Sequence, residues 1–369
     1  MPGPRIDWMH ESLRWFDYWL KDIDTGIVDE PELTFYARKY EPPSSVKDIE
    51  AGYWRSETKW PIERTKCINY YLNSNNKLES TPCVSKEVDT FENVPTTGWA
   101  SGTWDPLALS WGLPLDQKYD EADSLIYSSE KLDSEIEVTG IPKLKIYFSS
   151  DKEISTIVTR LCDVSPDGTV NLVTKGLINC THRNSHSKPE KLEKGKIYEI
   201  EIELDATSYI FEKDHQIRIY MSGSDFPNIW PSPFKSNINI YKSPDQKSSL
   251  ILPVIPKADT EALIPDFIKL EDKLCFEDSP LKKYEITRDM LNNEIILNLD
   301  YESEREVTKG YTVYNFGDMT YTVSISDPSD AYLTVEWKYI LDGPINLTEM
   351  TSICTIKSTQ TEFNTNASL

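Results

Sequence analysis

The sequence contains no apolar run long enough to cross a bilayer, which takes about 18 residues, and this argues against a membrane span. The N-terminal residues lack the charged and apolar regions of a signal peptide, so we expect a cytoplasmic protein. Positive charge is scarce, because 39 Lys and Arg residues stand against 61 Asp and Glu residues, a net charge of -22. Nucleic acids and anionic membranes require positive fields, so neither is an expected partner.

Cysteine is thinly spread over the 369 residues, and no two cysteines form a C-x-x-C pair. A secreted domain held together by disulfides would be shorter and denser in cysteine. We therefore expect free, buried thiols in a reducing compartment. The six positions are Cys67, Cys83, Cys162, Cys180, Cys275 and Cys354.

Glycine is also scarce, which makes a search for a nucleophile elbow exhaustive. The G-x-S-x-G motif of serine hydrolases needs two glycines four positions apart with serine between them. Among the 14 glycines only Gly98 and Gly102 have this spacing, and the residue between them is Ala100. Neither G-x-G-x-x-G nor G-x-x-x-x-G-K-[ST] occurs, so the sequence predicts no catalytic serine elbow, no phosphate cradle and no cofactor.

The few histidines suit neither a catalytic triad nor a metal site. His10 falls within a predicted helix, and His215 precedes a predicted strand in a turn. His182 and His186 have a metal-like spacing, but they lie in a predicted loop without supporting ligands. The segment 163–168 begins like a calcium loop, yet threonine stands where that loop needs its twelfth-position glutamate, so we predict a hairpin turn.

One strongly amphipathic helix is predicted over residues 7–21. Asp7 can cap it, and its apolar residues recur at the three- and four-residue spacing of a helix. So wide an apolar face has to pack against another surface. The face consists of Met9, Leu13, Phe16 and Leu20, widened by Trp8, Trp15 and Trp19.

From about residue 60 onward, period-2 alternation predicts short strands with one face in a core. Turn residues separate them without intervening helices, which is typical of a β-sandwich or jelly roll. The clearest of these strands are expected at 68–72, 144–148, 156–161, 197–204 and 216–221, and a separate strand is expected at 33–36, after the helix. A linker is expected at 257–280, followed by strands at 293–299, 321–325 and 332–337, and residues 364–369 are expected to fray.

A long tryptophan-rich connection runs from residue 94 to residue 115. Loops of this length inside a compact domain are often functional. Its three tryptophans, Trp99, Trp104 and Trp111, could stack on a ligand or line a cleft, or they could be buried under the rim of the sandwich. Both interpretations stay open.

Several characteristic stretches stand in order along residues 4–256, including R-W-F-D-Y-W-L (14–20), W-R-S-E (54–57), R-L-C-D-V-S-P-D-G (160–168), D-F-P (225–227) and W-P-S-P (230–233). They resemble the CocE/NonD family, which contains cocaine-esterase-like acyl esterases and is related to Xaa-Pro dipeptidyl-peptidases. The resemblance implies a remnant of an α/β-hydrolase domain at residues 1–40 and a jelly roll of the galactose-binding-like type at 41–256. Residues 257–369 would form the linker and additional strands.

In this family the catalytic Ser, Asp and His all lie upstream of the helix that opens this chain. The resemblance therefore implies an accessory domain of a serine hydrolase that is inactive by itself. The loop around Gly98, Trp99 and Trp104 would face the substrate cleft. The stripe with Trp8, Trp15 and Trp19 would dock on an α/β-hydrolase domain or subunit, because such a patch otherwise stays exposed.

Two other functions remain open. The chain could be a stand-alone jelly-roll module that binds a sugar or a peptide through the tryptophans of the 94–115 connection. It could also be a scaffold subunit for a separately encoded hydrolase.

Overall fold

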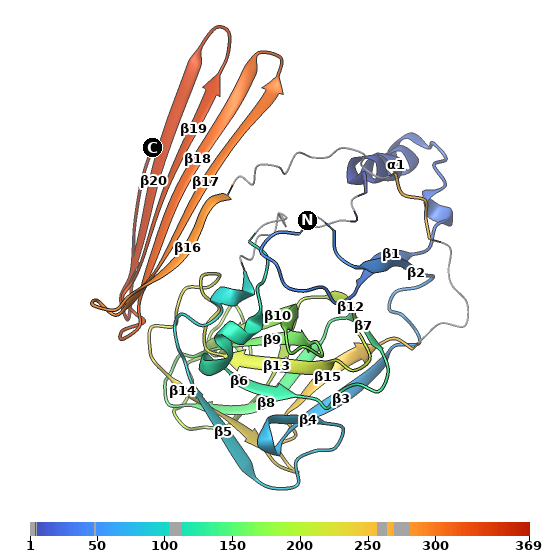
Figure 1. Cartoon of the computed structure of the whole chain (residues 1–369), viewed down its shortest axis with the longest axis vertical. Coiled ribbons are helices and arrows are strands. Elements are labelled where there is room, and N and C mark those ends of the chain that lie inside the picture. The colour runs from blue at the N-terminus through green and yellow to red at the C-terminus, as the bar shows by residue number, and fades with distance from the viewer. Residues whose placement is uncertain (1–3, 5, 48, 103–111, 257–263, 269–280) are drawn as a thin grey trace.

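The computed structural model describes residues 4, 6–47, 49–102, 112–256, 264–268 and 281–369. These form a mainly β structure with one N-terminal helix and two separate sheets (Figure 1). No helix in these residues is long and apolar enough to span a membrane.

The helix α1 (Trp8–Lys21) confirms the amphipathic helix predicted from the sequence. At its start, the Asp7 side chain accepts a hydrogen bond of 3.0 Å from the backbone N–H of His10, as expected of a capping residue. It ends at Asp22, whose φ of 55° is left-handed. A short turn of 3-10 helix, η1 (Ile27–Asp29), follows.

The larger sheet has 15 strands and includes every strand predicted between residues 33 and 256. Short 3-10 helices lie in connections between its strands: η2 (Ser74–Asn76), η3 (Trp99–Ser101), η4 (Gln117–Asp123) and η5 (Cys180–His182). Its strands are β1 (Leu33–Arg38), β2 (Gly52–Glu57), β3 (Lys66–Asn73), β4 (Lys77–Glu79), β5 (Glu87–Glu92), β6 (Leu125–Ser128), β7 (Ile136–Gly140), β8 (Lys143–Ser150), β9 (Thr156–Val164), β10 (Val170–Asn179), β11 (Tyr198–Glu203), β12 (Thr207–Phe211), β13 (Gln216–Ser222), β14 (Asn237–Lys242) and β15 (Ser249–Val254).

This sheet folds over on itself into two layers, which we call the body. One layer contains β10-β9-β13-β6, and the other contains β11-β8-β14-β5. Side chains of both layers meet in one core, for example Leu161 and Ile219 from the first layer with Ile146 and Ile240 from the second. Alternating strands thus bury their apolar faces between the layers, as the sequence pattern predicts.

The N-terminal strand β1 belongs to this sheet. It pairs with β2 along its whole length, and Arg38 stands opposite Tyr209 of β12. The Arg38 guanidinium also donates to Thr207 Oγ1 at 2.8 Å and to the Val173 carbonyl at 2.9 Å. These bonds tie residues 33–38 to the body, whereas the predicted domain division would place them with the helix. The division at residue 40 stays a prediction.

The second sheet, which we call the C-terminal sheet, is an antiparallel meander in chain order. The three strands predicted here are present and longer than predicted. Our expectation that residues 364–369 fray is wrong, because residues 363–368 form a strand that hydrogen-bonds to β20 although all its side chains are exposed. The six strands are β16 (Leu281–Asp289), β17 (Glu294–Thr308), β18 (Tyr311–Ser324), β19 (Ala331–Asp342), β20 (Leu347–Ser358) and β21 (Phe363–Ser368).

Most buried side chains of the C-terminal sheet lie at its base, although Val313 near the far end of β18 is buried as well. At the base, Leu297, Tyr321 and Val323 share a core with Phe226 of the body. The far ends of the long strands project away from the body (Figure 1). Most of the expected linker at 257–280 lies outside the described residues.

The five described cysteines are free. Cys83, Cys162 and Cys180 are buried as expected, and burial raises the pKa of the Cys162 and Cys180 thiols to about 12. Cys67 is exposed and Cys354 is half-buried, which differs from the expectation of uniformly buried thiols. Cys275 lies outside the described residues.

Candidate functional site

We call residues 94–102, the part of the predicted cleft loop that precedes the gap at 103–111, the rim loop. Gly98 has a φ of 110°, and a Cβ there would lie 2.6 Å from Asp225 Cα. Its N–H donates to Asp120 Oδ1 at 3.1 Å. Glycine is therefore required at this position for both its backbone angle and the close approach of residue 225.

Trp99, the second predicted cleft residue, is half-buried. Its ring stacks on Tyr119 of η4, with centroids 5.2 Å apart and planes 26° from parallel. It also packs against the core that the C-terminal sheet shares with the body. Trp104 and Trp111 lie outside the described residues. The orientation of these tryptophans toward a cleft therefore stays a prediction.

A buried carboxylate holds the rim loop in place. Asp225 accepts a hydrogen bond from Ser101 Oγ, one of 2.6 Å from Lys175 Nζ and one of 3.2 Å from Asn228 Nδ2. All of Asp225 is buried, so its charge requires these partners. Ser101 Oγ also lies 2.7 Å from the Gly98 carbonyl, which accepts from it. Asp225 thus acts as the hub of the rim loop.

A second buried ion pair fixes η4 beside the rim loop. Arg160 donates to Asp120 Oδ2 at 2.7 Å, and both side chains are 1% exposed. Arg160 also donates to Gln117 Oε1 at 3.0 Å, and Gln117 Nε2 donates to the Ala100 carbonyl at 2.7 Å. These contacts join β9, η4 and the rim loop into one polar network, which the sequence did not predict.

The structure contains one buried carboxylate–imidazole pair that the sequence did not reveal. His215 Nδ1 lies 2.8 Å from Asp163 Oδ1, and the Tyr209 hydroxyl donates to Asp163 Oδ2 at 2.9 Å. Burial raises the pKa of Asp163, and the contacts with His215 oppose this shift. In the described part of the chain no serine hydroxyl is hydrogen-bonded to a histidine. The pair therefore braces the body, whereas the sequence suggested only a turn role for His215.

The remaining histidines and the calcium-like segment lie in a helix, a loop and a hairpin turn. His10 lies in α1, as predicted. The rings of His182 and His186 lie 5.5 Å apart, centroid to centroid. Residues 165–169 connect β9 to β10, and Thr169 N donates to Asp167 Oδ1 at 2.9 Å, which confirms the hairpin turn predicted at 163–168.

The predicted docking stripe is exposed along α1. Trp8, Trp15 and Trp19 are 64%, 50% and 56% exposed, and no residue of the helix is buried. The opposite side of the helix is attached to the following turn, because Arg14 forms ion pairs with Glu11 and Glu30. The apolar face is thus left without a covering surface in the described part of the chain.

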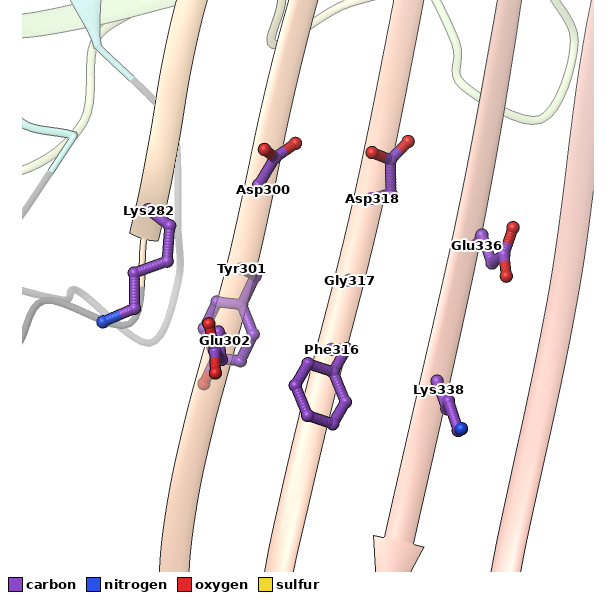
Figure 2. A pocket seen from close by; sticks show the side chains of 9 residues that line it. All are labelled: Lys282, Asp300, Tyr301, Glu302, Phe316, Gly317, Asp318, Glu336 and Lys338. Carbon is purple, nitrogen blue, oxygen red and sulfur yellow. The ribbon is translucent and has the colours of Figure 1, made fainter.

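A shallow pocket lies on the polar face of the C-terminal sheet (Figure 2). Asp300, Asp318 and Glu336 stand opposite one another on three adjacent strands. Like charges in direct cross-strand contact repel. We assign this row no ligand. The remaining lining residues are Lys282, Tyr301, Glu302, Phe316, Gly317 and Lys338.

Residues 25–251 match the family model of the X-Pro dipeptidyl-peptidase C-terminal non-catalytic domain. The chain belongs to this family. The match ends within β15, so the C-terminal sheet lies outside it. The domain normally accompanies an α/β-hydrolase catalytic domain.

Two curated relatives support the membership. The cocaine esterase of Rhodococcus sp. (strain MB1 Bresler) is 27% identical over 277 residues, which are 68% of this chain and 46% of the esterase. A putative Xaa-Pro dipeptidyl-peptidase of Bacillus anthracis is 23% identical over 220 residues, 60% of this chain and 33% of that protein. The chain thus spans at most about half the length of these relatives.

Solved structures show the same fold. A CocE/NonD family hydrolase from Staphylococcus aureus aligns with a TM-score of 0.52 and 17% identity, over 67% of this chain and 46% of the hydrolase. An aminopeptidase from a marine sediment Thaumarchaeota archaeon aligns with a TM-score of 0.56 and 19% identity, over 69% of this chain and 46% of its own. The resemblance to the CocE/NonD family is confirmed.

Proposed function

We propose that this chain is the accessory, non-catalytic part of a serine hydrolase of the acyl-esterase or Xaa-Pro dipeptidyl-peptidase type. In this proposal the body is a jelly roll of the galactose-binding-like kind. It docks on an α/β-hydrolase domain or subunit and shapes one side of the active-site cleft. The family membership supports the proposal, and so do relatives about twice as long as the matched region.

The single observation that carries the proposal is the exposed apolar face of α1. Apolar side chains of this size in one continuous face are typical of a surface that another protein covers. The Trp15 and Trp19 rings lie 5.7 Å apart, so they present one joined aromatic surface. The polar side of the helix is already occupied by the Arg14 ion pairs, which leaves the tryptophan side for the hydrolase.

The rim loop supplies the proposed contact with the cleft. Asp120 holds its backbone through the Gly98 N–H, and Asp225 holds the Ser101 side chain. A loop fixed in this way can present side chains to a substrate with little loss of conformational entropy. Trp99 and the adjoining Trp104 are the residues we propose for that role.

Docking can be tested by co-expressing the chain with an α/β-hydrolase polypeptide that carries a G-x-S-x-G elbow and is encoded upstream of it or elsewhere in its genome. We expect a stable complex in size-exclusion chromatography with light scattering. The variant Trp15→Glu/Trp19→Glu should weaken the complex at least a hundredfold, because it buries two charges in an apolar contact. Val84→Glu is the control, since Val84 is 91% exposed and lies far from α1 in the sequence.

Equal binding by the double variant and the control would show that α1 is not the docking surface.

The proposal also predicts that the chain alone does not hydrolyse p-nitrophenyl esters or Xaa-Pro-nitroanilides. The Ser101 hydroxyl is buried, and the Asp225 carboxylate that accepts its hydrogen bond is itself paired with Lys175, so Ser101 lacks the imidazole base of a catalytic triad. Steady-state assays of the pure chain, Ser101→Ala and His10→Ala check this. Turnover that disappears in either variant would show that the substituted residue is catalytic.

A further inference from the structure

An aromatic stack connects the C-terminal sheet to the body. The ring of Tyr321 on β18 lies between Phe226 and Trp230, with centroid distances of 5.1 Å and 5.3 Å and planes within 30° of parallel in both pairs. Phe363 of β21 meets the Trp230 ring edge-on at 5.6 Å. Two strands of the sheet therefore hold one short loop of the body, residues 225–230.

Charged and polar groups meet across the same junction. Burial raises the pKa of Tyr284 on β16 to about 12, and the nearby Asp225 carboxylate contributes to the rise. Burial also raises the pKa of Asp123 in η4, and the positive charge of Arg288 on β16 opposes that rise. The first strand of the sheet thus lies close to the carboxylate hub and to η4.

The loop that the sheet holds is the loop that fixes the rim. Asp225 and Phe226 are adjacent in the chain, and both are completely buried. The Phe226 N–H donates to the Thr97 carbonyl at 2.9 Å, and Gly98 packs directly on Asp225. In a close-packed interior, a displacement of Phe226 cannot leave these neighbours in place. Asp225 and Phe226 therefore connect the Tyr321 stack rigidly to the rim loop.

The junction also contains buried polar atoms that lower its stability. Tyr284 Oη, Tyr321 Oη and Trp230 Nε1 have no hydrogen-bond partner among the described residues. Burying such groups without partners opposes docking, and the aromatic contacts must offset this. Docking of the sheet is therefore sensitive to the loss of a single ring.

We propose that the C-terminal sheet is a positioning element for the rim loop. When the sheet is docked, the Tyr321 stack holds Phe226 and Asp225, and these hold Gly98 and Ser101. When the sheet separates, the rim loop loosens. The meaning of this coupling for catalysis rests on the proposed function, in which the rim loop shapes the cleft, but the coupling itself is a property of this chain.

Hydrogen exchange of the whole chain, followed by mass spectrometry, tests the proposal. In Tyr321→Ala we expect the amides of residues 95–102 and of the base of the C-terminal sheet to exchange at least tenfold faster. Strand β9, in the core of the body, should keep its rates. Tyr321→Phe is the matched control, because it keeps the stacked ring and removes only the unpartnered hydroxyl, and its rim loop should exchange as slowly as in the original chain.

Faster exchange in the sheet with unchanged exchange in residues 95–102 would overturn the proposal, and so would unchanged exchange in both. If Tyr321→Ala unfolds the body as well, Phe363→Ala replaces it, since Phe363 is largely exposed and contacts Trp230 by its edge. We then expect about a twofold faster exchange of the rim loop, and no change there would refute the coupling.

The variant Tyr321→Ala also distinguishes this inference from the proposed function. Tyr321→Ala leaves the apolar face of α1 intact, so it should bind the hydrolase as well as the original chain does. Loss of docking only in Trp15→Glu/Trp19→Glu, together with unchanged rim exchange in Tyr321→Ala, would retain the accessory function and reject the positioning role.

Discussion

The body and the C-terminal sheet are built from similar alternating strands, yet they achieve stability differently. The two layers of the body enclose a continuous core in which side chains such as Phe148 and Ile219 are completely buried. The C-terminal sheet is a single layer, and most of its buried side chains, such as Leu297 and Val323, lie at its base. A sheet needs a covered face for independent stability, so we expect the body to fold alone and the C-terminal sheet to depend on its contact with the body.

The two regions also differ in where their charged side chains lie. In the body, charged groups are buried in pairs, as in the contact of Arg160 with Asp120. On the C-terminal sheet, Asp300, Asp318 and Glu336 stand in an unpaired row on the polar face. Solvent tolerates such a row, whereas a closed core does not. The contrast suggests three experiments, ordered by the size of the expected effect.

The largest effect is expected from removing a core ring. Phe148→Ala should lower the free energy of unfolding of the body by about 3–5 kcal/mol, because it leaves a cavity between the layers. Leu297→Ala should destabilise the C-terminal sheet by about 2–5 kcal/mol and leave the exchange of β9, in the core between the layers of the body, unchanged. Residue-resolved hydrogen exchange at increasing urea concentrations measures the stability of the body and of the C-terminal sheet separately. Equal destabilisation of the body by Leu297→Ala would mean that the two regions unfold as one unit.

A somewhat smaller effect is expected from the buried ion pair. Arg160→Met leaves the Asp120 carboxylate buried without its cation, which should cost about 3–4 kcal/mol. Arg160→Met/Asp120→Asn should recover part of this loss, because the neutral amide still accepts from the Gly98 N–H. The control Lys59→Met breaks the exposed Lys59–Glu63 pair and should cost less than about 1 kcal/mol. A double variant no more stable than Arg160→Met would contradict the charge argument.

The smallest effect is expected from the acidic row. Asp318→Asn removes the central charge and should stabilise the C-terminal sheet by about 0.2–1 kcal/mol. Asp342→Asn is the matched control, since its cross-strand neighbours Thr312 and Leu347 are uncharged. The difference between the two variants should shrink in high salt, which screens exposed charges. Thermal unfolding at two salt concentrations measures it, and equal behaviour of the variants would show that the row carries no repulsion.

Local patterns in the sequence predicted α1 and most strands of the body. The helix follows from apolar spacing and the Asp7 cap, and the strands follow from alternation. Residues 363–368 were missed because F-N-T-N-A-S shows no apolar alternation, and their strand exists only through hydrogen bonds to β20. The candidate site was predicted in part, since Gly98 and Trp99 were selected, but Asp225, Lys175 and Tyr321 were not given any role in it.

The sequence by itself determined the amphipathic helix, the alternating strands, the lack of a nucleophile elbow and the stretches that mark the family, because each is written in residues close together in the chain. Only the tertiary structure decided which carboxylate holds the rim loop and which ring joins the two sheets. Ser101 and Asp225 are 124 positions apart, and their contact depends on how the strands pair and the layers close. No local pattern encodes such a contact, since it forms only when the fold is complete.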